Sequence, residues 1–527
     1  MTEMTNPVLP GSFPDPSICR VGDDFYMVNS SFEYFPGLPI HHSRDLVNWE
    51  LIGHALDRPE QCQGPVFLTD VQSDGGIHAP TIRYKDGVFY LITTNVYMPP
   101  EAPADFNPCV NFILTATNPA GPWSEPKVIS GAPGIDPDIF FDDDGRVWYV
   151  GTHSPSDPAY PSEGEIWLQE LDLDCTSLIG ERYFLWRGTG GDWVEGPHMY
   201  KYNGRYYLMT AEGGTGFYHA VTVACSDAIT GPYRSNPRNP ILTSRHLTHN
   251  YWVNSTGHGD LVELADGRWY MVCLGIRNDI ASRSNMGRET HLLPVVWEAE
   301  NPDNRDMLWP VCAPDTGKVE KHLPLPFPGS SQPGNGNFYD DFSGQTLKKE
   351  WSFRRLPEAS HFQILPEQQR LRIWPGQPVR ERSQSTVIGF RQSHSYFNYQ
   401  ATLHIPDTMG SSEIGIGILQ KDNHHLFLGV SQNDNGLDLI VKLNDVVLAS
   451  ATIADKTTAL ELFVHCAENG YDCGHITNGQ KVPVINSIPI DSMLSRYYTG
   501  AFCCLYGVNP EGTSEVFADF SDVKFLN

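Results

Sequence analysis

Five copies of one short pattern recur in the first part of the chain and limit what it can fold into. Each copy joins a turn containing Asp or Asn beside Gly to a strand rich in aromatic and branched residues. The tyrosines of these five strands are Tyr26, Tyr90, Tyr149, Tyr207 and Tyr270. Their spacings of 64, 59, 58 and 63 residues are too long for one hairpin and match a four-stranded unit with its loops.

Five such units predict a five-bladed β-propeller over residues 1–322. One blade cannot bury both of its faces alone, so neighbouring blades must cover them and close a ring. An irregular β-sandwich with coincidental turns is the alternative, and the regular spacing argues against it. Because the sequence also lacks a long amphipathic helical pattern, we expect an all-β chain.

The composition and the pattern of apolar residues change after the last repeat. Residues 323–337 are rich in Pro, Gly and Ser and predict a linker. From residue 338 to residue 527, short alternating apolar runs are separated by turn signals about every ten residues. This pattern predicts a second domain, a C-terminal β-sandwich.

The charge balance excludes several kinds of partner. The chain of 527 residues carries 63 Asp and Glu against 36 Lys and Arg, a net charge of -27. Such a chain repels phosphate backbones and anionic lipids, so we expect neither nucleic acid nor membranes as partners. The N-terminal residues lack a basic segment followed by an apolar one, which favours a cytoplasmic location. Eleven cysteines without a Cys-x-x-Cys motif favour reduced, buried thiols over disulfides or metal ligands.

Three carboxylates stand at similar places in different repeats. Asp15, Asp136 and Glu195 precede the repeat tyrosine of their own unit by 11, 13 and 12 residues. Each lies beside proline or a Gly-Pro pair, which fixes the local backbone. Equivalent positions in a ring of blades face one axis, so these three are expected to meet in the central channel. A turn role for each remains the plain alternative, and Asp138 competes with Asp136.

Several motifs together resemble glycoside hydrolase family 43, in particular its β-xylosidase and α-L-arabinofuranosidase members with a C-terminal concanavalin-like β-sandwich. The motifs cover residues 6–11, 13–17, 31–37, 41–45, 75–80, 195–198, 210–215 and 287–290. The resemblance implies an inverting exo-glycosidase in which Asp15 is the general base and Glu195 the general acid. Asp136 would be the third carboxylate, which orients the acid and keeps it protonated. Inversion predicts about 6.5–9.5 Å between the carboxyls of base and acid.

The resemblance also implies residues that bind the sugar. Arg288 would hold two hydroxyls with its guanidinium fork, and Phe32 would line the pocket wall. His78 stands where relatives often have Trp, a departure that could shift the balance between xylosides and arabinosides. His258 precedes Tyr270 by 12 residues and is expected in the channel, either hydrogen-bonded only or near a hydrated structural calcium ion.

The expected reaction is release of xylose or arabinose from the non-reducing ends of short xylo- or arabino-oligosaccharides, with no cofactor required for the chemistry. The sandwich is expected to close the pocket through a loop around residues 504–508, rather than to act as a separate sugar-binding module. Alternatives are a mainly α-L-arabinofuranosidase activity, a non-catalytic sugar-binding propeller, and a fructan-cleaving enzyme. The last usually carries an Arg-Asp-Pro motif, which this sequence lacks. Homo-oligomers are left open.

Overall fold

The computed structural model describes the chain except for residues 1–2, 104–105, 331–333, 335, 383, 434–435, 454–456, 496–497 and 513–514. The regular secondary structure of the described part is almost entirely β-strand, which confirms the expected class. Its helical elements are four short 3-10 turns: η1 (Pro59–Cys62), η2 (Ala359–His361), η3 (Pro366–Gln368) and η4 (Ile490–Met493). None of the described helices is long and apolar enough to cross a membrane. All eleven cysteines are free, and nine of them are buried.

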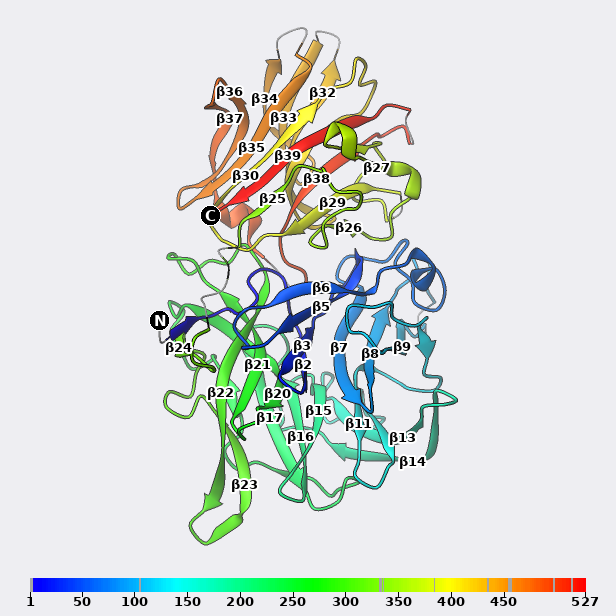
Figure 1. Cartoon of the computed structure of the whole chain (residues 1–527), viewed down its shortest axis with the longest axis vertical. Coiled ribbons are helices and arrows are strands. Elements are labelled where there is room, and N and C mark those ends of the chain that lie inside the picture. The colour runs from blue at the N-terminus through cyan, green and yellow to red at the C-terminus, as the bar shows by residue number, and fades with distance from the viewer. Residues whose placement is uncertain are drawn as a thin grey trace.

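Five antiparallel sheets form the predicted propeller (Figure 1), and each pairs its strands in chain order, except that β18 and β19 both pair with β17 in the fourth sheet. The first two blades are β2 (Ser17–Val21), β3 (Asp24–Val28), β5 (Gly37–Ser43), β6 (Glu50–Leu56), then β7 (Gly76–Lys85), β8 (Val88–Val96), β9 (Cys109–Ala116) and β10 (Lys127–Val128). The third is β11 (Ile135–Phe141), β12 (Val147–His153), β13 (Glu165–Asp172) and β14 (Ser177–Trp186). The fourth is β15 (Glu195–Tyr202), β16 (Arg205–Glu212), β17 (Ala220–Ser226), β18 (Arg234–Ser235) and β19 (Leu242–Thr243). The fifth is β20 (Val253–Glu263), β21 (Trp269–Arg277), β22 (Arg288–Asn301) and β23 (Asn304–Cys312).

The repeat tyrosines lie on the second strand of each blade, directly after the turn that joins it to the innermost strand. Gly87 in the second blade has φ +86, a conformation that glycine adopts without strain. The repeated pattern therefore marks the first hairpin of every blade. This explains why distances counted from the tyrosine locate equivalent positions on the innermost strands.

The N-terminal segment closes the ring by binding the fifth blade. The backbone N–H of Val8 donates to the carbonyl of Thr290 at 3.0 Å, and β1 (Glu3–Thr5) pairs with β24 (His322–Pro324). Leu323 and Phe327 pack against the apolar cluster between the first and fifth blades. The beginning of the predicted linker is therefore docked on the propeller, because its apolar side chains are buried there. Residues 331–333 and 335 of that linker lie outside the described part.

The C-terminal domain is the predicted sandwich of two sheets packed over one apolar core. One sheet contains β25 (Phe338–Asp340), β27 (Phe362–Leu365), β28 (Arg370–Ile373), β30 (Phe397–His404), β35 (Ala459–Ala467), β36 (Gly470–Thr477), β37 (Gln480–Ile488) and β39 (Ala518–Leu526). The other contains β26 (Ser352–Arg354), β29 (Thr386–Arg391), β31 (Glu413–Lys421), β32 (His424–Asn433), β33 (Gly436–Leu443), β34 (Val446–Ile453), β38 (Phe502–Val508) and, from the propeller, β4 (Tyr34–Phe35).

The two domains are joined by backbone pairing and by a buried ion cluster. β4 leaves the first blade and pairs with β26 of the sandwich. At the same place the guanidinium of Arg354 lies 3.2 Å from Glu33 and 2.7 Å from Asp422. The side chains of Arg354 and Glu33 are both fully buried, so this contact between the domains is out of reach of solvent.

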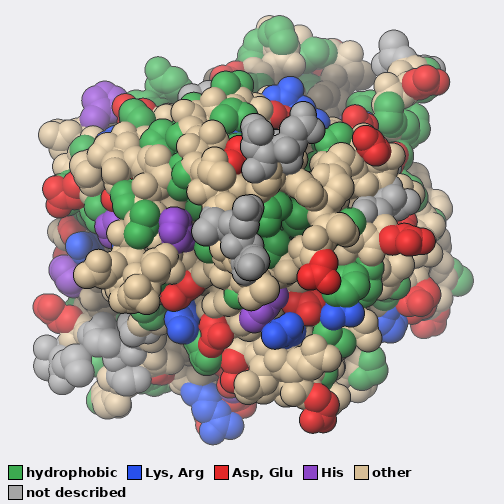
Figure 2. Space-filling view, turned by 90° about the horizontal axis from the view of Figure 1, so that it is seen from above, with side chains coloured by type: hydrophobic (Ala, Val, Ile, Leu, Met, Phe, Trp, Pro, Cys, Tyr) green, Lys and Arg blue, Asp and Glu red, His purple; other side chains and the backbone are tan. Residues whose placement is uncertain are grey.

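The excess of acidic groups is spread over the surface. Viewed from the sandwich end, the molecule shows Asp and Glu side chains at many separate places, interspersed with Lys and Arg (Figure 2). Dispersed charge of one dominant sign favours solubility.

Candidate active site

A local backbone irregularity on the innermost strand of each blade positions the site. In the second to fifth blades the pairing register shifts near the start of this strand, which is the mark of a β-bulge. A residue with positive φ lies at the corresponding point of every blade: Asp15 (φ 51), Ala79 (φ 27), Asp136 (φ 53), Gly196 (φ 53) and His258 (φ 44). Asp15, Ala79, Asp136 and His258 thereby line the cavity at the channel mouth, and in the fourth blade the residue before Gly196, Glu195, does so. Left-handed backbone at non-glycine residues is strained and is concentrated at functional sites.

One cavity of about 280 Å³ lies at this mouth and contains all three predicted carboxylates. Its lining includes Asp15, Asp136 and Glu195 together with the predicted His78, His258 and Arg288. The volume is near the lower end of the roughly 300–1,000 Å³ typical of ligand pockets, so it suits a single sugar ring. The competing Asp138 is fully buried and lies outside the lining.

Asp15 is held in its ionised form by its neighbours. Its Oδ1 accepts a hydrogen bond from Arg288 Nη1 at 3.0 Å, and its Oδ2 accepts one from the Ser30 hydroxyl at 2.6 Å. Burial alone would raise the pKa of Asp15, but Arg288, His258 and Ser30 outweigh it and leave the pKa below its usual range. The carboxylate is therefore a proton acceptor at neutral pH.

The pKa values of Glu195 and Asp136 are shifted in the opposite direction. Burial raises the pKa of the Glu195 carboxyl well above its usual range, and the nearby charges of Asp136 and Asp15 raise it further. Burial and the charge of Asp15 also raise the pKa of Asp136, whose Oδ2 accepts the Gly196 N–H at 3.1 Å. Carboxyls with separated proton affinities in one pocket provide an acid and a base at the same pH.

The rings of His78 and Tyr498 and the guanidinium of Arg288 line one side of the pocket. Phe32, which was expected to line the wall, packs against them but is 2% exposed and outside the lining. The ring of His78 meets that of Phe32 edge-to-face at 4.9 Å between centroids, and Tyr498 lies 5.8 Å from His78. The guanidinium of Arg288 lies 5.5 Å from the ring centroids of both Phe32 and Tyr498. Burial lowers the pKa of His78 to about 4, so it is a neutral ring here, and its Nε2 donates to the carbonyl of Asp74 at 2.9 Å.

The sandwich reaches the pocket through a different segment from the one predicted. Residues 504–508 belong to the buried strand β38, so the expectation that they form the closing loop is wrong. The contact is made by the segment just before β38, where the carbonyl of Tyr498 accepts from Arg288 Nη2 at 3.1 Å. Thr499 then donates its hydroxyl to Asp74 Oδ1 at 3.0 Å. The apolar run from residue 501 to 506 is the core of a strand, and the polar residues before it form the loop.

Other cavity residues were not predicted from sequence. Thr215 accepts a hydrogen bond from Arg288 Nη1 at 2.9 Å. It belongs to the motif at residues 210–215, but that motif predicts no role for this side chain. His219, Asp74 and Tyr498 also line the cavity. Tyr498 is separated from Asp15 by 483 positions, and no local pattern connects the two.

His258 faces Asp15, with 3.8 Å between Nδ1 and Oδ1, and burial lowers its pKa to about 4. Gly196 packs against it so closely that a Cβ would come 2.7 Å from Cε1. Among the described residues no group of three or more His, Cys, Asp or Glu side chains could hold a metal ion. A single imidazole does not fit direct coordination of calcium, which takes six to eight oxygen ligands. A hydrated ion near His258 stays a prediction.

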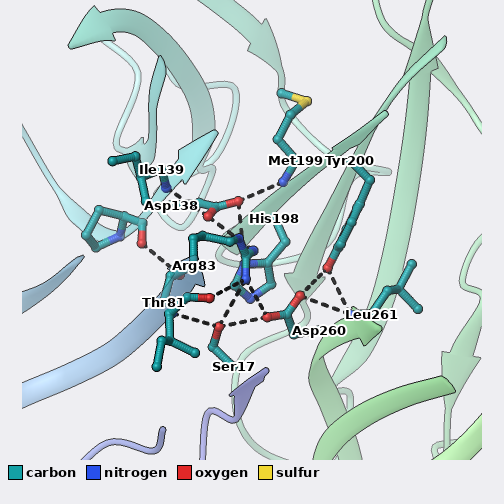
Figure 3. Close-up of polar contacts among 12 residues, drawn as sticks. Ser17, Thr81, Arg83, Asp138, Ile139, His198, Met199, Tyr200, Asp260 and Leu261 are labelled. Carbon is teal, nitrogen blue, oxygen red and sulfur yellow. Dashed lines mark hydrogen bonds and ion pairs between the residues drawn. The ribbon is translucent and has the colours of Figure 1, made fainter. Parts of the chain in front are cut away.

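A network of buried polar and charged groups links the innermost strands of all five blades (Figure 3). Arg83 lies at its centre, with 2.9 Å to Asp260, 3.1 Å to Asp138 and a hydrogen bond of 3.1 Å donated to His198 Nδ1. Ser17 of the first blade donates to Asp260 at 2.7 Å.

Network and pocket residues are related by sequence position. Ser17, Thr81, Asp138, His198 and Asp260 each lie two residues after the positive-φ residue of their blade. Thr81 takes part by donating its hydroxyl to the carbonyl of Pro137 in the next blade. Each innermost strand is therefore anchored directly below the side chain that it presents to the pocket.

A five-bladed propeller whose closed central pocket pairs an ionised carboxylate with two carboxyls of raised pKa and an arginine defines a glycoside-cleaving enzyme. The chain belongs to glycosyl hydrolases family 43, whose model matches residues 4–302. Residues 339–526 match the β-xylosidase C-terminal concanavalin A-like domain.

Similar proteins cover almost the whole chain. A xylosidase/arabinosidase of Butyrivibrio fibrisolvens is 36% identical over 99% of both chains. A xylosidase/arabinosidase of Humicola insolens is 43% identical over 83% of this chain and 78% of its own. Among solved structures, a family 43 protein of the Bacteroides ovatus xyloglucan locus has a TM-score of 0.87 at 32% identity, covering 99% of both chains. The xylan β-1,4-xylosidase of Bacillus halodurans has a TM-score of 0.88 at 29% identity, covering 99% of this chain and 100% of its own.

Proposed function

We propose that the protein is an exo-acting, inverting glycosidase that releases xylose or arabinose from the non-reducing ends of short xylo- or arabino-oligosaccharides. The observation that carries this proposal is the set of three carboxylates in one cavity of about 280 Å³. The ion network around Arg83 links the five innermost strands two positions beyond the cavity residues, and Tyr498 of the sandwich lines one side of the cavity. A pocket bounded in this way admits a chain end rather than the middle of a polymer.

The protonation states assign the roles in the reaction. Glu195, kept protonated by burial and by its neighbours, gives its proton to the glycosidic oxygen as the bond to the anomeric carbon breaks. Asp15 takes a proton from a water molecule, whose oxygen attacks the anomeric carbon from the opposite face. Asp136 maintains the proton affinity of Glu195 and is a positioning residue. The carboxyl separation of about 6.5–9.5 Å stays a prediction of this mechanism.

The sugar is bound by groups that recognise hydroxyls and one flat face. Arg288 reaches Asp15, Thr215 and the Tyr498 carbonyl and presents the remaining part of its fork to the pocket. Relatives carry names for both sugars, among them a xylan 1,3-β-xylosidase of Vibrio and a non-reducing-end α-L-arabinofuranosidase of Bacteroides ovatus. Both pentoses are therefore proposed as substrates, with arabinofuranosidase as the alternative main activity.

Paired substrates test the proposal directly. The purified protein is assayed on aryl β-D-xyloside and aryl α-L-arabinofuranoside, and the anomer first released is followed by proton NMR. Inversion with at least one substrate is expected. Retained configuration would contradict the assignment of Asp15 as the base. Binding of oligosaccharides without turnover, unchanged in Glu195→Gln, would instead indicate a non-catalytic sugar-binding propeller.

The proposed chemistry uses no cofactor, because each proton transfer has a carboxyl group of this chain. A cytoplasmic location would supply short imported oligosaccharides rather than polymeric xylan. This location and the assembly of the chain into homo-oligomers stay predictions.

A further inference from the structure

Trp193 is a large aromatic residue held outside the core in an unfavourable backbone conformation. Its φ is +46 and the residue is 52% exposed, although it lies two positions before Glu195. Positive φ is uncommon for bulky residues and persists where the surroundings enforce it. Here the Trp193 N–H donates to the carbonyl of Ser162 at 2.8 Å, and the next residue, Val194, is fully buried.

The indole ring is seated on a glycine beside the pocket. A Cβ on Gly214 would come 2.9 Å from Trp193 Cε3, so a side chain at this position would push the indole ring away from the turn. Gly214 has φ +66 and is followed by Thr215, which lines the cavity and accepts from Arg288. One edge of the ring system is therefore fixed next to two separate parts of the cavity wall, and about half of the residue is exposed.

A second exposed aromatic flanks the same turn. Tyr218 is 67% exposed and is followed by His219, a cavity residue. The carbonyl of Tyr218 lies so close to Gly213 that a Cβ there would come within 2.3 Å of it. Phe217, itself 40% exposed, meets Tyr218 edge-to-face at 5.6 Å. Trp193 and Tyr218 are thus attached to the rim on the side of the cavity that carries Glu195.

We infer that Trp193, with Tyr218 beside it, is a stacking platform for the leaving part of the substrate: the sugar ring or rings beyond the bond that is cleaved. Glu195 protonates the oxygen that joins the sugar in the pocket to the leaving part, so the leaving part emerges next to Glu195. Flat aromatic faces pack against the C–H face of a sugar ring, and an exposed Trp offers a large rigid surface for this. The inference rests on the proposed function and extends it to substrate length.

The test compares substrates that differ only in the leaving group. Trisaccharide substrates are xylotriose and α-1,5-L-arabinotriose, and the one that the wild type cleaves faster is compared with the methyl glycoside of the same sugar. Methanol is too small to reach the platform. In Trp193→Ala the ratio of kcat/KM for trisaccharide to that for methyl glycoside is expected to fall about tenfold. Tyr218→Ala is expected to lower it less, and Trp193→Phe to retain most of it.

Tyr339→Ala, at a 46% exposed aromatic of the sandwich, is the matched control and should leave the ratio unchanged. An unchanged ratio in Trp193→Ala would overturn the platform while leaving the proposed function intact. An unchanged ratio with an altered molar mass by light scattering would assign Trp193 to a contact between copies of the chain and would also overturn it. If the wild type cleaves neither trisaccharide, the proposed function fails and the platform fails with it. Trp193→Phe, which conserves an aromatic ring, decides the question should Trp193→Ala not fold.

Discussion

At the scale of single residues, the proposed mechanism makes the alkaline limit of the reaction depend on the pKa of Glu195. After burial, the largest influence that raises the pKa of Glu195 is the charge of Asp136. Removing that charge in Asp136→Asn lowers the pKa of Glu195, so the acid loses its proton at lower pH. The alkaline limb of kcat/KM is therefore expected to move to lower pH by about one unit or more.

The acid limb supplies the internal control for Asp136→Asn. It reports protonation of Asp15, whose pKa is lowered chiefly by Arg288, against the effect of burial. Asp136 has the higher pKa of the two and is already uncharged where Asp15 takes up its proton, so this limb should move much less. An alkaline limb that stays in place would refute the role of Asp136 in tuning the acid.

Glu195→Gln separates acid catalysis from binding. The amide cannot give a proton to the glycosidic oxygen, so kcat on an unactivated oligosaccharide is expected to fall by about 10²–10⁴-fold. A dinitrophenyl glycoside has a leaving group that needs no proton, and its kcat should fall by much less. Rates on both substrates are measured by product release. An equal loss on both would show that Glu195 acts in binding or in folding rather than as the acid.

The three carboxylates were predictable from sequence because one repeat fixes both the hairpin tyrosine and the bulge residue. Glu195 shows the limit of that reasoning, since the positive-φ residue of its blade is the neighbouring Gly196. Asp138 could not be excluded from sequence, because two positions along the same strand lead from the pocket to the ion network. Only the direction of each side chain separates these roles.

At the scale of elements, the segment before β38 is fastened over the pocket by one carboxylate. Asp74 accepts from the Thr499 hydroxyl, forms an ion pair with Lys421, and holds His78 through its backbone carbonyl. It thus connects the start of β7 with two parts of the sandwich. We call these contacts of Asp74 with Thr499, Lys421 and His78 the latch. We expect the latch to set the position of Tyr498 beside the sugar.

Two conservative changes test the latch without altering a group that lines the cavity. Thr499→Val and Lys421→Met each remove one partner of Asp74, and each is expected to raise KM several-fold with a smaller change in kcat. The reason is that a loosened loop binds the ground state and the transition state less tightly to a similar extent. Michaelis kinetics on the preferred aryl glycoside give both constants. A loss confined to kcat would place these residues in the chemical step instead.

Sequence patterns predicted the blades and the sandwich, but not the elements that join them. The alternation of β38 identifies a strand, whereas the pocket loop before it has no period or turn motif that aims it at the propeller. The place of Arg83 at the centre of the channel network could not be predicted either, because a single arginine in a strand does not indicate which distant residues it will contact. Contacts between distant segments are decided by the folded arrangement.

At the scale of the whole molecule, the joint between the domains contains a carboxyl with an unusual proton affinity. Burial raises the pKa of Glu33 to about 7, and the nearby Arg354 only partly opposes this. The same side chain follows Phe32 in sequence and precedes β4, the strand that the propeller gives to the sandwich. The protonation of one group is therefore linked to the docking of two domains.

The sign of the resulting pH dependence follows from the folded and unfolded states. The unfolded carboxyl has a pKa near 4.5, so between about pH 4.5 and 7 the folded state binds the proton more tightly. The stability contributed by Glu33 is then greatest below pH 4.5 and falls as the pH rises to 7, by about 3 kcal/mol in total. Glu33→Gln has no such proton and lacks this fall.

Burial lowers the pKa values of histidines such as His41 and His219 to about 3, and these groups change stability with pH in the opposite direction. The effect of Glu33 is therefore measured as a difference in Tm between the wild type and Glu33→Gln. The Tm of the wild type minus that of Glu33→Gln, measured by calorimetry from pH 4.5 to 8, is expected to decline by a few degrees and to level off above pH 7. Glu367→Gln, at an exposed position, should give a flat difference. A flat difference for Glu33→Gln as well would mean that Arg354 and Arg355 hold Glu33 ionised throughout, and that domain docking does not respond to pH at this joint.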